Sequence, residues 1–475
     1  MRTIEHVQTP TGRRWSLRLA VAAGVILLFA LGAVPAGASG AKGPQKLIFD
    51  LTATPSWTRT FHGLAGAPDA AEDVVMTTGG VTYVAGTIEG AAGTGTNASL
   101  MKLVNGVPAW PAPKTYDSPY HSMDTATKMA LGPGGTIYTA GLSVGANGMP
   151  DILVLKWSSS GAVKWAKRYD GPSHGVDLPN AMVVDSAGNV TVGGYSVGAT
   201  GADWVVVSWS ASGVRRWTSR YSSSSPHEIA PFGMVVASDR SVYASGVSSI
   251  PPAVASVTVK YSPSGVTLWK KTYTGPAGLG ALVWAAVARP GGGVYVCGST
   301  NSAGTGADGL VMSYTASGAR DVFALGTGPG GATSQSFKDL TVTSTSQVVA
   351  VGSSTAGGNE DLHAATYTVD GTIAGQVTLP GAWEDEFVAV ASDAFGGFYA
   401  TGRYHTAVNK TAVFTARGSV LTGGGGWWSL WQPAFVSEDN EPNAIAVRGS
   451  TAIVVGEARQ GLLEGVDQVV LGYIY

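Results

Sequence analysis

Short apolar segments that end in glycine recur along the chain at a regular interval. Each is a run of mostly apolar or β-branched residues closed by Gly, and the segments are 82–86, 137–141, 190–194, 242–246, 294–298, 348–352, 398–402 and 452–456. Their terminal glycines lie 50 to 55 residues apart. Short β-rich runs of this kind, bounded by turn residues, indicate strands rather than helices.

Four strands can be drawn within each unit. An apolar first strand such as 181–184 is followed by a polar turn and by the glycine-terminated second strand. The third runs from an Asp to an aromatic residue, as in Asp151–Trp157, and the fourth contains a Trp such as Trp165. The turn between them contains a glycine, for example Gly161, which suits a positive φ.

A period near fifty residues with four strands per unit predicts an all-β chain that forms a single eight-bladed β-propeller of four-stranded blades. Seven blades are the alternative. The composition agrees, because 67 of 475 residues are glycine and 13% are charged, as in a turn-rich all-β protein.

The repeat is split between the two ends of the chain. A third strand, 467–473, is followed by only two more residues, while Trp57, Phe61 and Gly63 repeat the spacing of a fourth strand. We therefore expect the N-terminal strand to pair with the three C-terminal strands and close a ring, which leaves no free sheet edge.

The N-terminal residues predict export. Arg13, Arg14 and Arg18 precede an uncharged apolar stretch, 19–34, and the small residues 36–38 suit signal peptidase. The stretch is shorter than the ~20 residues that span a membrane, although an uncleaved anchor is an alternative. We expect an export signal at 1–38, a linker at 39–55 and the propeller at 56–475. After cleavage near Ala38 the protein would be secreted or associated with the cell surface, without a stable membrane span.

Cysteine content and charge narrow the possible partners. Cys297 is the single cysteine, so no disulfide forms within the chain, and its place in a second strand predicts a small buried residue. The formal net charge of −2 and the lack of a basic stripe argue against a nucleic-acid partner. We expect a monomer.

The segment 177–194 resembles the bacterial secreted β-propeller repeat often called SBBP. It has an Asp before the first strand, an Asp-x-x-Gly-Asn turn at 185–189 and a second strand that ends in glycine. The resemblance implies a propeller and an exported location, and it implies no chemistry. The Ser-Gly-x-x-x-Trp element at 160–165 is also similar to the repeat of quinoprotein dehydrogenases. That similarity implies a bound quinone, which usually stacks on a vicinal disulfide that this chain cannot form.

Acidic residues recur before the first strand of most units. Those 17 residues before a terminal glycine are Asp69, Asp124, Asp177, Asp385 and Asp439. A second series, which includes Asp151, opens the third strands and is expected on the same face. Carboxylates suit Ca²⁺ or another divalent cation, so the first series is a candidate metal-binding set. The alternative is that each carboxylate accepts backbone N–H groups in its own turn.

Histidine and tryptophan supply candidate ligand-binding residues. Four histidines lie in the segments that lead into successive first strands, and three tryptophans cluster outside the repeat: His62, His121, His174, His227, Trp427, Trp428 and Trp431. The chain has no recognisable catalytic motif. We therefore predict a non-enzymatic scaffold that binds an extracellular protein or glycan. A carbohydrate-acting hydrolase or lyase with its site at the acidic channel mouth is the first alternative, and a quinoprotein-like dehydrogenase is the second.

Overall fold

A computed structural model describes residues 45–46, 49–61, 69–90, 95–222, 227–249, 254–302, 306–326, 334–355, 359–379, 381, 383–407, 410–419, 426–431, 440–459 and 466–474. All described residues belong to one compact unit, 38–475. The predicted export signal therefore lies outside the described residues. Within them, no helix is long and apolar enough to cross a membrane.

The described strands pair in consecutive antiparallel groups, which we call sheets and number in chain order; short parallel pairings join sheets 3 and 4, and sheets 5 and 6, into larger ones. Sheet 1 contains β4 (Ala70–Met76), β5 (Val81–Glu89), β6 (Thr96–Val104), β7 (Val107–Pro108) and β8 (Lys114–Tyr116). Sheet 2 contains β9 (Lys128–Leu131), β10 (Ile137–Val144), β11 (Pro150–Trp157) and β12 (Val163–Tyr169). Sheet 3 contains β13 (Asp177–Val184), β14 (Val190–Val197), β15 (Gly201–Trp209) and β16 (Arg215–Tyr221). Sheet 4 contains β17 (His227–Val236), β18 (Val242–Ser248), β19 (Ala255–Tyr261) and β20 (Thr267–Tyr273).

The second half of the chain repeats this arrangement. Sheet 5 contains β21 (Ala281–Ala288), β22 (Val294–Ser302), β23 (Gly306–Tyr314) and β24 (Arg320–Gly326). Sheet 6 contains β25 (Ser334–Val342), β26 (Val348–Thr355), β27 (Glu360–Tyr367) and β28 (Ile373–Leu379). Sheet 7 contains β29 (Glu386–Ser392), β30 (Gly397–Ala407), β31 (Lys410–Ser419) and β32 (Gly426–Trp431). Sheet 8 contains β33 (Asn440–Arg448), β34 (Thr451–Arg459), β35 (Val466–Ile474) and, from the N-terminal region, β3 (Trp57–Phe61). Two short 3₁₀ helices complete the described elements, η1 (Pro133–Gly135) and η2 (Pro276–Gly278).

The prediction of an all-β chain built from four-stranded antiparallel sheets is confirmed. Turn chemistry follows the sequence as well, because Gly161 and Gly213 adopt φ angles of 83° and 82° in the turns between third and fourth strands. A positive φ at these positions strains any residue with a Cβ. Short parallel pairings also link β15 to β17 and β23 to β25.

The segment expected as a linker contributes strands of its own. β1 (Gln45–Lys46) pairs in parallel with β28, and β2 (Phe49–Thr52) pairs in parallel with β32. Both add to the outermost strand of a sheet. An outermost strand has unpaired backbone N–H and C=O groups, and an added strand satisfies them.

The hydrophobic cores lie between neighbouring sheets. Side chains of sheet 2 such as Ile152 pack against Val205 and Trp209 of sheet 3, all with 2% or less of their surface exposed. One cluster joins sheet 1 to sheet 8, where Val84 and Met101 pack with Val470. Because both faces of a sheet are covered in this way, the middle strands are nearly continuous apolar runs.

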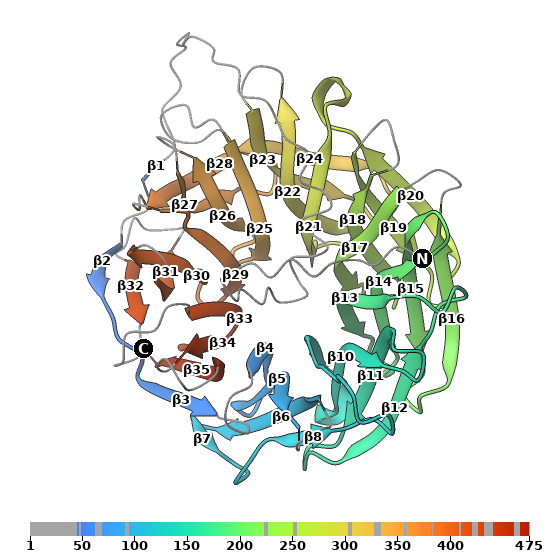
Figure 1. Cartoon of the computed structure of the whole chain (residues 1–475). Coiled ribbons are helices and arrows are strands. Elements are labelled where there is room, and N and C mark those ends of the chain that lie inside the picture. The colour runs from blue at the N-terminus through green and yellow to red at the C-terminus, as the bar shows by residue number, and fades with distance from the viewer. Residues whose placement is uncertain are drawn as a thin grey trace, which may run out of the picture. The chain divides into compact units, whose positions relative to one another are not determined.

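The early strand β3 and the C-terminal strand β35 pair in sheet 8. β3 runs antiparallel to β35, with Trp57 opposite Gly472 and Phe61 opposite Gln468. Figure 1 shows β3, in blue, beside β35, in red. The first strand of each sheet also contacts the first strand of the next sheet, and β33 contacts β4.

The fourth-strand tryptophans pack on glycines of the following sheet. A Cβ on Gly213 would lie 3.1 Å from the ring of Trp165, and one on Gly265 would lie 2.5 Å from the ring of Trp217. Trp57 makes the same contact with Gly106 of sheet 1, where the corresponding distance is 2.3 Å. The N-terminal Trp therefore makes the contact of a fourth-strand Trp, as its sequence spacing predicts.

Candidate functional site

Two loops that join successive sheets carry the same set of polar residues. Residues 116–124 join β8 to β9 and residues 169–177 join β12 to β13, and both read Tyr-Asp-x-Pro-x-His-x-x-Asp. We call them the 116 loop and the 169 loop. Each contains one of the predicted His and Asp pairs.

The two loops have the same turn geometry. The backbone N–H of His121 donates to the carbonyl of Ser118 at 2.9 Å, and that of His174 donates to Gly171 at 3.0 Å. Both histidines have a positive φ, 47° and 49°, a conformation in which His is more common than most non-glycine residues.

Each imidazole is held by the Asp four residues earlier. His121 Nδ1 lies 2.8 Å from Asp117 Oδ2, and His174 Nδ1 lies 2.8 Å from Asp170 Oδ2. The histidine side chains are 65% and 73% exposed. The hydrogen bond and the negative charge of Asp170 raise the pKa of His174. Both rings are therefore oriented and open to solvent.

The last Asp of each loop is buried and supports the turn. Asp124 Oδ2 accepts from the backbone N–H of Ser118, and Asp177 Oδ2 accepts from that of Gly171, both at 2.6 Å. Both residues are 0% exposed. Burial raises the pKa of each carboxyl group because it penalises the charged form, and these N–H donors oppose the shift.

The 169 loop brings three carboxylates together. One oxygen each from Asp151, Asp170 and Asp177 lies within 4.8 Å of the other two, and we call this group the acidic cluster. The residues come from the start of β11, the residue after β12 and the start of β13. First and third strands therefore begin on one face, as the sequence analysis expected.

Arg168 provides a basic partner at the edge of the acidic cluster. Its Nη2 lies 2.5 Å from Asp151 Oδ2 and 3.1 Å from the carbonyl of Ser143. Burial still raises the pKa of Asp151, although Arg168 acts in the opposite direction. Arg220 forms the equivalent pair with Asp203 one sheet further along, at 2.6 Å.

The other predicted carboxylates lie in separate loops. Asp69 Oδ1 accepts from the N–H of Glu89 at 2.8 Å, and Asp385 Oδ1 accepts from the N–H of His405 at 2.6 Å. Both residues are buried. In the part of the chain that the structure describes, the acidic cluster is the single group of three possible His, Cys, Asp or Glu ligands, and Asp177 is the one member that the predicted metal set contains.

Asp439 lies outside the described residues, and Asn440 occupies the corresponding place. In each sheet, one residue of the first strand lies opposite the glycine that closes the repeated apolar segment of the second strand. Asp69 and Asp177 each lie two positions before that residue. In sheet 8 the residue opposite the glycine is Pro442, so the equivalent position is 440. The turn between β33 and β34 is shorter, so counting back 17 residues gives a position one too early. Asn440 Nδ2 donates to the carbonyl of Thr411 at 2.7 Å.

The remaining candidates are only partly described. His62 lies outside the described residues, and His227 is described only as the first residue of β17, opposite Gly201. Trp427 and Trp428 are described only by their places in β32, opposite Arg417 and Ala416. Trp431 is partly buried and packs against a cluster that includes Tyr399 and Tyr473. Among the described candidates, His121 and Asp124 share one loop and His174 and Asp177 share another, but each imidazole pairs with a different Asp, Asp117 or Asp170.

Sequence reasoning missed Asp117 and Asp170. Neither belongs to a series that recurs in every unit, so counting from the glycines did not select them. The nine-residue agreement between the two loops is the signal that identifies them.

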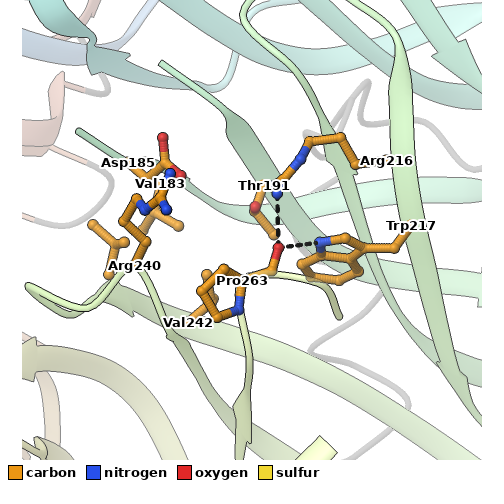
Figure 2. Close-up of a pocket in the computed structure, with 9 residues that line it drawn as sticks. Val183, Asp185, Thr191, Arg216, Trp217, Arg240, Val242 and Pro263 are labelled. Carbon is orange, nitrogen blue, oxygen red and sulfur yellow. Dashed lines mark hydrogen bonds between the residues drawn. The ribbon is translucent and has the colours of Figure 1, made fainter. Parts of the chain in front are cut away.

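A pocket on the side where first and second strands are joined is too small for a ligand. Figure 2 shows its lining, which includes Val183, Asp185, Arg216, Trp217 and Arg240. The carbonyl of Pro263 accepts from Arg216 at 2.9 Å and from Trp217 at 3.2 Å. The open volume is about 10 Å³, which is the space of about one water molecule. These contacts join sheets 3 and 4.

Comparisons with known proteins concern the fold alone. No family model matches the sequence, and no protein of curated function matches it. Solved structures with a similar arrangement include the β-propeller domain of the Trilobed protease from Pyrococcus furiosus, with 10% identity and a TM-score of 0.42 over 74% of this chain and 94% of that one.

Two further structures are similar over more of the chain. Sqt1 from Chaetomium thermophilum has 14% identity and a TM-score of 0.48 over 86% of this chain and 97% of that one. An ulvan lyase, which is a polysaccharide lyase, has 11% identity and a TM-score of 0.45 over 86% of this chain and 95% of that one. The structural neighbours thus include β-propeller proteins.

Proposed function

We propose that the chain is an exported, closed, eight-bladed β-propeller that binds an extracellular protein or glycan without chemical turnover. The pairing of β3 with β35 and the contact of β33 with β4 support closure of the ring. The resemblance of 177–194 to the SBBP repeat and the N-terminal pattern of 1–38 support export.

The observation that carries the binding function is the exposed pair His121 and His174. A feature that serves only packing would recur in every sheet, as the buried tryptophans and tyrosines at fixed spacing do, for example Trp157 and Tyr367. The oriented imidazole beside a carboxylate occurs in two successive loops and is missing from the equivalent loop 273–281. Exposed polar loops on a rigid scaffold are a common binding surface.

The binding test uses the mature chain from Ser39 onward, immobilised and probed with a glycan array and with purified extracellular proteins. We expect a ligand that the wild type captures and that the double variant His121→Ala, His174→Ala captures at least tenfold more weakly. Phe395→Ala is the matched control, because Phe395 is 72% exposed in a turn of sheet 7. Equal capture by the wild type and the double variant would reject this surface.

Export is tested separately. The proposal predicts that protein recovered outside a bacterial host begins near Ser39. Retention in the cell with an intact N-terminus would contradict the exported location without affecting the binding test.

A carbohydrate-acting hydrolase or lyase is the second candidate. Asp151 and Asp177 are buried carboxyl groups with raised pKa values, and both lie beside Asp170. A carboxyl group with a raised pKa close to a second carboxyl group is the arrangement of a general acid and its partner. Products released from a glycan panel by the wild type, and not by a folded Asp177→Asn variant, would favour the enzyme. Capture without products would favour the scaffold.

A further inference from the structure

We propose that the acidic cluster of Asp151, Asp170 and Asp177 binds a divalent cation of the Ca²⁺ type, and that Asn97, Asp117 and Asp124 form a second site of the same kind. This inference does not depend on the identity of any protein or glycan ligand. It differs from the metal set expected from the sequence, because each site gathers residues from two neighbouring sheets and the loop between them.

The first argument is the unused oxygens of the acidic cluster. Asp151 and Asp177 are 3% and 0% exposed. Asp151 Oδ2 is taken by Arg168 and Asp177 Oδ2 by the N–H of Gly171. Asp151 Oδ1 is buried and has no hydrogen-bond partner, and the buried Asp177 Oδ1 has no donor other than the nearby Ser196 hydroxyl. A buried carboxylate oxygen without a donor is costly, and a cation within reach of both would remove that cost.

The carboxylates of the acidic cluster lie close enough together to share one ion, and the ion can enter from solvent. One oxygen from each of the three carboxylates lies within 4.8 Å of the others, so small side-chain movements would bring all three to one ion. The side chain of Asp170 is 38% exposed, which gives the ion a path from solvent and leaves room for water ligands. Asp170 is held in place by its hydrogen bond to His174 Nδ1, as outer partners commonly orient a ligand.

The second site follows from the repeat. Asn97 occupies the place of Asp151. Asn97 lies opposite Ile88, which is two positions after the repeat glycine Gly86, and Asp151 lies opposite Ser143, two positions after the repeat glycine Gly141. In the 116 loop, Asp117 and Asp124 correspond to Asp170 and Asp177. Oδ1 of Asn97 and of Asp117 is buried and has no hydrogen-bond partner, and the buried Asp124 Oδ1 has no donor other than the nearby Ser143 hydroxyl. The same unused oxygens thus recur where the loop sequence recurs.

The two sites differ in their basic neighbours. In the acidic cluster Arg168 pairs with Asp151, and Arg220 opposes the rise that burial causes in the pKa of Asp177. In the second site Asn97 is neutral, and the residue equivalent to Arg168 is Thr115, because Thr115 lies opposite Ser99 as Arg168 lies opposite Leu153. The change from Asp to Asn therefore accompanies the change from Arg to Thr.

A third loop shows that the turn does not need these acids. Residues 273–281 have the same length and a Pro at the same position, and Gly278 donates to Gly275 at 3.3 Å with a φ of 75°. The equivalents of the three ligands are Ala255, Thr274 and Ala281 there. Because this turn forms without carboxylates, the turn does not require the acids of the 116 and 169 loops, although Asp124 and Asp177 each accept a backbone N–H there.

The donor set favours Ca²⁺ over transition metals. The three residues of each site all offer oxygen. Ca²⁺ takes six to eight oxygen ligands in flexible geometry, so water would supply the others. Zinc prefers thiolate and imidazole, and the Nδ1 atoms of His121 and His174 already face Asp117 and Asp170.

The test is calorimetric titration of chelator-treated mature protein with CaCl₂, with melting curves at each Ca²⁺ concentration. We expect about two ions per chain and a Tm that rises with Ca²⁺. Asp170→Ala and Asp117→Ala should each remove one binding event, and the double variant should remove both. Asp170 and Asp117 are partly exposed, so these variants are expected to fold.

Thr274→Ala in the third loop is the matched control and should keep both events. Absence of binding and of a Tm shift at millimolar Ca²⁺ would overturn the proposal. So would Ca²⁺ binding that the folded double variant retains, or a preference for Zn²⁺ over Ca²⁺ in the wild type. Failure of the glycan and protein arrays would leave this result unaffected, since the titration uses Ca²⁺ alone.

Discussion

The indole of Trp57 lies over Gly472, the residue directly opposite it on β35. A Cβ on Gly472 would lie 2.1 Å from Trp57 Cε2, so the ring occupies the space that any larger residue would need. The same indole also reaches Gly106 in sheet 1. One aromatic side chain near the start of the chain therefore contacts both the last strand and the first sheet.

This contact predicts that Gly472→Ala destabilises the fold. The added methyl group must displace the Trp57 ring, and overpacking of this kind costs about 1–3 kcal/mol in the free energy of unfolding. Gly79→Ala is the control, because a Cβ at Gly79 meets no atom closer than 4.0 Å and its φ is ordinary. Urea unfolding at one temperature measures both. Equal stability of the two variants would contradict the packing of Trp57 on β35.

The buried Asp69 is predicted to have a structural role. Its carboxylate accepts from the N–H of Glu89 at 2.8 Å, and Asp69→Ala would leave that donor without its acceptor, at a cost of about 1–3 kcal/mol. Asp69→Asn keeps a carbonyl oxygen and should cost less. Urea unfolding with and without Ca²⁺ separates this role from metal binding, because the destabilisation by Asp69→Ala should not depend on Ca²⁺. A loss that disappears on chelation would contradict this assignment.

Asp339 predicts a loss of stability as the pH rises. Its carboxylate joins sheets 6 and 7 by accepting from the N–H groups of Leu340 and Val390, both at 2.9 Å. Burial nevertheless raises its pKa from 3.8 to about 6. The folded state therefore binds the proton more tightly than the unfolded state. The stabilisation is complete below the unfolded pKa, near 4, and is lost as the pH rises through about 6.

A shift of about two pH units corresponds to about 3 kcal/mol between pH 4 and pH 7. Asp339→Asn cannot ionise, so the stability difference between variant and wild type should move in favour of the variant over this range. Urea unfolding at pH 4.5, 5.5 and 7 measures that difference. A difference that is constant with pH, or that moves the other way, would contradict the raised pKa.

Much of the fold could be predicted from the sequence because the repeat fixes the phase of every strand. Trp57 was assigned to a fourth strand from three residues, since the spacing of Trp, aromatic and Gly is set by packing between sheets. Counting 17 residues back from the repeat glycine selects Asp439, one residue too early, because a shorter turn between β33 and β34 places Asn440 at the equivalent position. A fixed count cannot detect a change in turn length.

The candidate sites were predictable only in part. The positions of Asp151 and Asp177 in their strands were readable, whereas their proximity depends on how one sheet packs on the next. Asp170 lies after the end of β12 in a loop whose path the strand pattern does not set. The comparison of the 116 and 169 loops with each other, rather than with the whole repeat, would have selected it.

Closure of the ring by β3 and β35 is the claim on which the rest depends, and a disulfide between these two strands tests it most directly. Thr60 and Val469 lie opposite each other in the antiparallel pair of β3 and β35, where Cα atoms are about 4.5–5.5 Å apart and a disulfide can form. Cys297 is buried and fully covered, so it should not compete.

In the folded double variant Thr60→Cys, Val469→Cys, we predict a single intramolecular disulfide and a higher Tm than in the reduced protein. Mass spectrometry of peptides from unreduced protein identifies the link, and each single variant should remain a free thiol. Closure would be contradicted if the double variant folds but both introduced thiols stay free under oxidising conditions, or if they pair only between chains.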